Sequence, residues 1–154
     1  MDGFAAERAS WIWGLSLIAM TIAVHAIGIV VVAFLFMRVR IWTENQHLGL
    51  PQVMPIVIAV VGATGLLLAV LHGLEAAIWA AAYVWLGALN SPFDAILYSV
   101  DSMSTRGSSG LVLESHWRMM GALEAVDGML LFGISTAYIF AVMQVYWPML
   151  SRRA

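Results

Sequence analysis

The chain has 154 residues, of which 62% are hydrophobic and 10% are charged, and it contains no cysteine. A soluble domain of this length has too little interior to bury so much apolar side chain, so the composition predicts one integral membrane domain. The formal net charge of -2 gives no basic surface for nucleic acid, and the missing cysteines exclude disulfides and thiolate metal sites.

The first apolar run, residues 11–37, carries no formal charge. About 27 residues at about 1.5 Å each give a helix of about 40 Å, which is long enough to cross a bilayer. The run is too long for the core of a signal peptide and has no basic segment before it, so we expect a retained membrane helix. Arg38 and Arg40 are expected to end this helix, and residues 42–50 to form a short polar connector.

The second apolar run, residues 51–89, is longer than one bilayer requires, so its helix must tilt or protrude. His72 and Glu75 interrupt its apolar character, and we expect them to hydrogen-bond to each other. His25 stands alone in the first run, and the sequence contains no H-x-x-x-H motif. Because a metal or haem site needs converging ligands, no metal and no cofactor is predicted.

A helix start is predicted after residue 90, with Ser91 as N-cap, Pro92 as first helical residue and Asp94 as capping acid. The helix that follows, residues 92–104, is too short to span a bilayer and is expected to be re-entrant. Residues 105–110 are small, polar and glycine-containing, and irregular backbone at membrane depth is stable only against protein or water. A last helix is predicted over residues 117–147, with a tryptophan at each end.

The arginines indicate an orientation, because cytoplasmic loops are enriched in basic residues. Four of them fall on one side of the predicted topology: Arg38, Arg40, Arg152 and Arg153. We therefore expect a multi-pass protein of the cell (inner) membrane, with the C-terminus cytoplasmic and the N-terminus and re-entrant segment outside. Arg8 and Arg118 oppose this assignment.

Residues 99–107 read S-V-D-S-M-S-T-R-G, which resembles the pore helix and filter entry of bacterial potassium channels, roughly S-V-E-T-x-T-T-V-G-Y-G-D. Residues 117–128 and 131–137 look like the inner helix of small bacterial ion-channel proteins. Residues 72–75, followed by Trp79 and Ala80, look like the outer helix of that group. The resemblance covers roughly residues 55 to 147.

The resemblance implies a pore unit of two transmembrane helices with a re-entrant pore half-helix and a filter loop between them, assembled as a homotetramer. Together with the helix predicted from the first apolar run, the expected fold is all-α with three transmembrane helices. Residues 1–50 would form an N-terminal transmembrane helix and cytoplasmic connector. Residues 51–150 would form the pore domain, with outer helix 51–89, pore helix 92–104, filter 105–110 and inner helix 117–147. The implied function is that of a passive ion channel and not an enzyme, and its partners are further copies of the chain, a permeant inorganic ion and the lipid bilayer.

The candidate filter departs from the family's pattern. Its residues are Ser104, Thr105, Arg106, Gly107, Ser108, Ser109 and Gly110. Potassium filters replace the ion's hydration shell with backbone carbonyls, and their glycines permit the required φ values. Thr105 and Gly107 match the family. Arg106 replaces a small aliphatic residue, and Ser108 replaces an aromatic residue. Ser109 replaces the second glycine, and Gly110 replaces an acidic residue. A filter that is not strongly potassium-selective is therefore expected.

Arg106 has two interpretations. Its side chain can lie behind the filter and pair with Asp101, which holds the place of the family's pore-helix acid, so that both charges are buried and satisfied. Alternatively, four Arg106 side chains line a wider mouth, and rings of arginine favour anions.

The last helix carries a polar stripe. At 100° per residue, one face holds Glu124, Asp127, Gly128, Leu131, Ser135 and Tyr138. Such a stripe faces either a water-filled cavity or the bundle interior. Four copies of Asp127 would make an acidic ring below the filter, with Glu124 and Ser135 also in the cavity. Alternatively, Glu124 and Asp127 hydrogen-bond to neighbouring helices. Gly128 and Gly133 are either gating hinges or small residues for close packing.

Two other functions stay open at this point. The rewritten filter is compatible with a non-conducting structural or sensory membrane subunit that keeps the pore scaffold. A membrane metalloenzyme using His25, His72, Glu75 and His116 has the least support, because these residues are scattered along the sequence.

Overall fold

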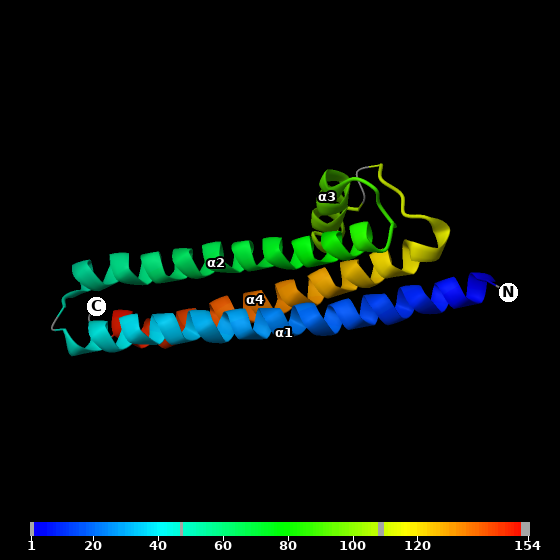
Figure 1. Ribbon diagram of the computed structural model, residues 1–154. Coiled ribbons are helices and arrows are strands. Elements are labelled where there is room, and N and C mark those ends of the chain that lie inside the picture. Colours follow the sequence, from blue (N-terminus) through cyan, green and yellow to red (C-terminus); the bar gives the residue numbers. More distant parts are fainter. Residues whose placement is uncertain (1, 47, 108–109, 152–154) are drawn as a thin grey trace. The chain divides into compact units, whose positions relative to one another are not determined.

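A computed structural model describes residues 2–46, 48–107 and 110–151. Within these ranges the chain forms α1 (Asp2–Asn45), α2 (Leu50–Trp85), α3 (Pro92–Met103), a short 3-10 helix η1 (Ser115–Trp117) and α4 (Arg118–Ser151) (Figure 1). Three stretches are long and apolar enough to cross a membrane: Glu7–Asn45, Leu50–Trp85 and Ser115–Pro148. The predicted all-helical fold is confirmed.

Helix α1 is longer at both ends than its apolar run predicted. Arg38 and Arg40 do not end it, and the polar connector is reduced to the few residues between Asn45 and Leu50. Arginine and glutamate are good helix formers, so charge alone does not stop a helix. The Arg40 Nε atom lies 2.9 Å from Glu44 Oε1, an i,i+4 pair that supports this last stretch.

Helix α2 ends earlier than its apolar run predicted, at Trp85 instead of Leu89. Gly87 has φ +71°, a left-handed conformation that glycine adopts without strain. The Ala88 N–H donates to the Tyr83 carbonyl at 2.9 Å, and the Gly87 N–H to the Val84 carbonyl at 3.1 Å. This pair of bonds is a Schellman motif, and the glycine is what allows the helix to stop there.

The chain divides into two compact units: unit 1 is Met1–His25 with His72–Phe132, and unit 2 is Ala26–Leu71 with Gly133–Ala154. The core of unit 1 is built around the fully buried side chains of Trp79, Tyr83 and Met120. Helix α3 belongs to this unit, and the Tyr83 and Tyr98 rings meet edge-to-face with centroids 5.4 Å apart. Aromatic contact thus fixes α3 against the end of α2.

Unit 2 has its own apolar core of Val53, Val57, Val60, Val142 and Tyr146. The Tyr146 hydroxyl donates to the Phe36 carbonyl at 3.2 Å. The C-terminal part of α4 therefore lies beside the C-terminal part of α1 in this unit.

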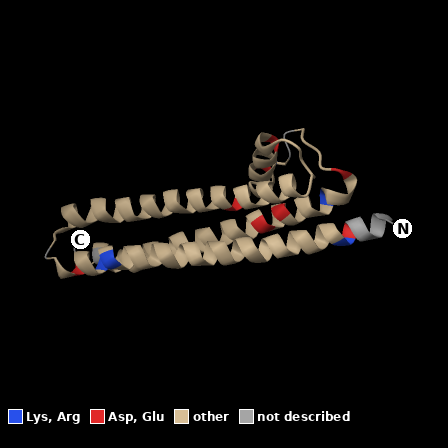
Figure 2. Ribbon diagram, viewed as in Figure 1, with Lys and Arg blue, Asp and Glu red and all other residues tan. Residues whose placement is uncertain are grey.

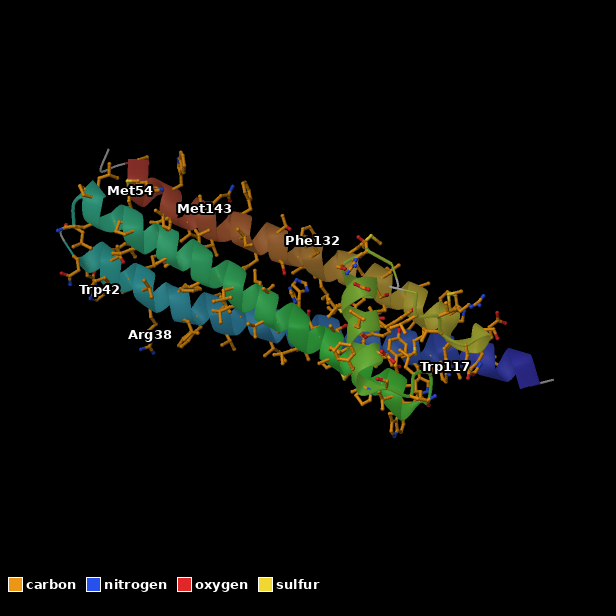
Figure 3. All side chains as sticks on the ribbon, turned by 90° about the horizontal axis from the view of Figure 1, so that it is seen from above. Arg38, Trp42, Met54, Trp117, Phe132 and Met143 are labelled. Carbon is orange, nitrogen blue, oxygen red and sulfur yellow. The ribbon has the colours of Figure 1, made fainter. Side chains whose placement is uncertain are left out.

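Apolar side chains also cover the outside of the helices. Figure 3 labels Phe132 of α4, Met54 of α2 and Trp42 of α1, whose side chains are 69%, 49% and 55% exposed. A soluble monomer rarely shows so continuous an apolar surface. Lipid is the solvent that such helices require.

Gly128 of α4 marks the closest approach of α3. A Cβ atom placed on Gly128 would collide with the carbonyl oxygen, Cα and carbonyl carbon of Met103, the last residue of α3. Gly133, by contrast, has no atom within 4 Å of its Cβ position. In the single chain, Gly128 is therefore the point at which the end of α3 packs against α4.

We predict that Gly128→Ala destabilises the chain by about 1–3 kcal/mol, because the backbone of α3 has no flexible side chain to move aside. Thermal unfolding of the purified protein, followed by circular dichroism, measures the effect. Gly133→Ala is the matched control, and it should leave the midpoint unchanged or raise it. Equal midpoints for Gly128→Ala and wild type would contradict the packing role.

Candidate functional site

The short helix α3 begins with the predicted cap. The Ser91 hydroxyl accepts a hydrogen bond from the Asp94 N–H at 3.2 Å, and Pro92 occupies the first helical position. The helix has 12 residues. At about 1.5 Å per residue it is about 18 Å long, well short of the roughly 30 Å of a bilayer core.

Helix α3 ends in the same motif as α2, but with a threonine where α2 has glycine. The Arg106 N–H donates to the Asp101 carbonyl at 3.1 Å and the Thr105 N–H to the Ser102 carbonyl at 3.0 Å. Thr105 has φ +59°. A β-branched residue in this region is a true outlier, and such strain is held only where the surroundings determine it. The predicted start of the filter is therefore a strained position.

Asp101 and Arg106 form the ion pair that one interpretation predicts. The Arg106 Nη1 atom donates to Asp101 Oδ1 at 3.1 Å. The Asp101 side chain is 2% exposed, whereas that of Arg106 is 72% exposed. The pair therefore differs from the expected buried one. The carboxylate lies inside unit 1, and the guanidinium lies at the surface of the single chain.

The segment after Arg106 has no regular secondary structure in its described part, as predicted. Gly107 and Gly110 have φ of +83° and +84°, values that favour glycine over any residue with a side chain. Ser108 and Ser109 lie outside the described residues. Ser104 is the C-cap of α3, and its hydroxyl donates to the Asp101 carbonyl at 3.1 Å.

The acidic residues of α4 are Glu124 and Asp127, and acidic positions are coloured red on the ribbon of Figure 2. Both side chains are fully buried in unit 1. Asp127 Oδ2 accepts from the Trp79 indole N–H at 2.9 Å and from the Thr21 hydroxyl at 2.6 Å. Glu124 Oε2 accepts from the Tyr83 hydroxyl at 2.8 Å. The polar stripe thus faces α1 and α2, as the hydrogen-bonding interpretation expects, and Ser135 farther along it is also buried.

His25, the one histidine of the first apolar run, lies beside Glu75 of α2. Its Nδ1 atom lies 2.8 Å from Glu75 Oε1, and His72 Nδ1 lies 3.3 Å from Glu75 Oε2. His72 thus lies close to Glu75, but the expected hydrogen bond is not seen, because Glu75 Oε2 has no hydrogen-bond partner among the described residues. A histidine 50 residues from Glu75 along the chain completes the cluster. No local motif signals this contact, because it depends on how α1 packs against α2.

Residues 71–145 match the model of a family described as an ion channel. The matched segment is just under half of the chain and contains the end of α2, all of α3, the loop after it and most of α4. No curated protein and no solved structure shows a significant match to the chain. The match falls on the elements in which the sequence resembles a channel pore.

We predict that Thr105→Gly stabilises the chain by up to about 1 kcal/mol, because glycine removes the cost of the left-handed conformation. Gly87→Thr is the reciprocal variant, and it should destabilise by about 1–2 kcal/mol. A Cβ at Gly87 meets nothing within 4 Å, so its effect is conformational alone. The thermal midpoint should rise for Thr105→Gly and fall for Gly87→Thr. A shift of both midpoints in the same direction would contradict the assignment of a left-handed residue to both helix ends.

We predict that Asp127→Ala costs about 1–3 kcal/mol, since the buried Trp79 N–H loses its acceptor. Adding Trp79→Phe, which removes the donor, should make the double variant more stable than the sum of the two single effects. A double-mutant cycle on thermal unfolding measures this coupling. Glu114→Ala, at an exposed carboxylate, is the control and should have little effect.

Proposed function

We propose that the chain is one subunit of a passive ion channel in which four copies surround a central path. The ion-channel match over residues 71–145 and the three membrane-spanning stretches support an ion-conducting membrane protein. The finer proposal concerns the path itself. The end of α3 and the loop that follows form this path. Helix α3 enters the membrane, and the loop returns the chain to the side from which α3 entered.

The observation that carries this proposal is the end of α3. Two short-range hydrogen bonds stop the helix at Ser104, and Thr105 and Gly107 then take left-handed conformations. The C-terminus of a helix carries partial negative charge, so four such ends facing one axis would attract a cation. Irregular backbone beyond them would present carbonyl oxygens to the ion.

The selectivity proposed is not that of a potassium channel. The Arg106 guanidinium is paired with Asp101, so the pair contributes little net charge near the path. Ser108 stands where a potassium filter has an aromatic residue, and Ser109 stands where it has its second glycine. We therefore propose a weakly selective cation path, in which hydrated ions are not stripped as completely as in a potassium filter.

We further propose that the N-terminus lies outside the cell (inner) membrane and the C-terminus in the cytoplasm. Arg38 and Arg40 lie on the part of α1 that packs beside the C-terminal part of α4 in unit 2. These arginines would therefore be cytoplasmic together with the C-terminus.

A reversal-potential measurement in proteoliposomes under asymmetric salt tests the function. We expect cation permeation, with potassium and sodium permeabilities within a few-fold of each other. Flux no greater than in empty liposomes would overturn the channel and favour a structural or sensory subunit. Reversal at the chloride potential would instead indicate an arginine-lined anion path.

The Arg106→Gln variant sharpens this measurement. It should raise cation permeability, because the unpaired Asp101 carboxylate then stays near the path. Arg118→Gln removes an arginine outside the loop and is the matched control, with no expected change in selectivity. A fall in cation permeability in Arg106→Gln alone would contradict the proposed role of the ion pair.

A further inference from the structure

We propose that His25, His72 and Glu75 form a binding site for a divalent transition-metal ion of the zinc class, joining α1 to α2 within unit 1. One ligand atom from each of the three residues lies within 4.8 Å of the others. The two imidazole rings are neighbours, with centroids 5.2 Å apart. This site is separate from the proposed ion path.

The spacing of the ligand atoms suits a tetrahedral ion. Zinc binds imidazole nitrogen and carboxylate oxygen at about 2.0–2.2 Å, which places ligand atoms about 3.3 Å apart in a tetrahedron. The two nitrogen–oxygen distances are 2.8 Å and 3.3 Å. The two imidazoles approach the two different oxygens of the Glu75 carboxylate, at distances close to the ligand separation of a zinc site.

The surroundings also fit a site with an open position. His25 and Glu75 are fully buried, and the His72 side chain is 28% exposed. Partial exposure of His72 leaves room for a fourth ligand from outside the chain, as in metal sites with three protein ligands. Glu75 Oε2 is buried and accepts no well-formed hydrogen bond among the described residues. A carboxylate within a membrane-spanning helix needs a compensating cation, and a bound metal would provide one.

Neighbouring bonds hold the ligands in place. Thr21 lies four residues before His25 on α1, and Trp79 lies four residues after Glu75 on α2. Both contact the Asp127 carboxylate, at 2.6 Å and 2.9 Å. The two ligand-bearing helices are therefore tied together one helical turn from the cluster, which preorganises it.

The donor set selects the kind of ion. Two imidazoles and one carboxylate suit zinc, iron(II) or cobalt(II), whereas calcium and magnesium prefer oxygen ligands alone. The chain has no cysteine, so thiolate-selective ions have no advantage. We therefore commit to a zinc-class ion and not to an alkaline-earth ion. The alternative that the test must exclude is a cluster that is held together by hydrogen bonds and binds no metal ion.

Cobalt(II) is the probe, because its visible absorption reports tetrahedral nitrogen and oxygen coordination. The full chain, purified in detergent and stripped with a chelator, should bind one cobalt ion per chain, displaced by zinc. Zinc should raise the thermal midpoint of the wild type, since it binds the folded state. Binding is measured without reference to ion conduction, so the result does not depend on the proposed channel.

His72→Ala is the deciding variant, because its partly exposed side chain can be removed with the least damage to the core. It should weaken cobalt binding at least about 10-fold and abolish the zinc-induced rise in midpoint. Glu75→Gln should also weaken cobalt binding and abolish the zinc-induced rise in midpoint, provided that its circular dichroism shows the helical content of the wild type. His116→Ala, at the His116–Glu114 pair in the region between α3 and α4, is the matched control and should bind like wild type. No stoichiometric binding by the folded wild type, or equal binding by His72→Ala, would overturn the site.

Discussion

The arrangement of unit 1 depends on one point of α4, where Asp127 and Gly128 stand side by side in the sequence. The Asp127 carboxylate accepts hydrogen bonds from Thr21 of α1 and Trp79 of α2. Gly128 receives the backbone of α3 at Met103. A buried carboxylate is costly without partners, and a helix backbone can come this close only where no side chain intervenes. Together the two residues set the positions of four helices.

The C-terminal ends of α2 and α3 show that the same pair of hydrogen bonds can form with or without backbone strain. Gly87 and Thr105 occupy equivalent places in their motifs, with φ of +71° and +59°. Only the threonine bears a cost for its conformation. That cost falls at the first residue of the candidate filter, beside the Asp101–Arg106 pair. The contacts that hold Thr105 in place are therefore also the contacts that hold the start of the filter.

Much of the local structure was predictable from the sequence. The Ser91 cap, the short α3 and the shared face of Glu124 and Asp127 follow from residue type and periodicity, which act over a few positions. Periodicity does not say what a face meets, so the burial of Asp127 against Trp79 required the packed helices. Helix α1 extends beyond its apolar run, because charged residues end an apolar run without ending a helix. The contact of His25 with Glu75 joins positions 50 residues apart, and no short-range signal encodes it.

The length of α1 has a consequence for how the protein meets bilayers of different thickness. A helix of 44 residues is about 66 Å long, roughly twice the hydrocarbon core. Its length therefore does not fix its depth. The depth is set by polar contacts at Thr21 and His25, which anchor it to α2 and α4 inside unit 1. In a thinner membrane α1 cannot slide to compensate, so the lipid around it must deform, at a cost of a fraction of a kcal/mol per ångström.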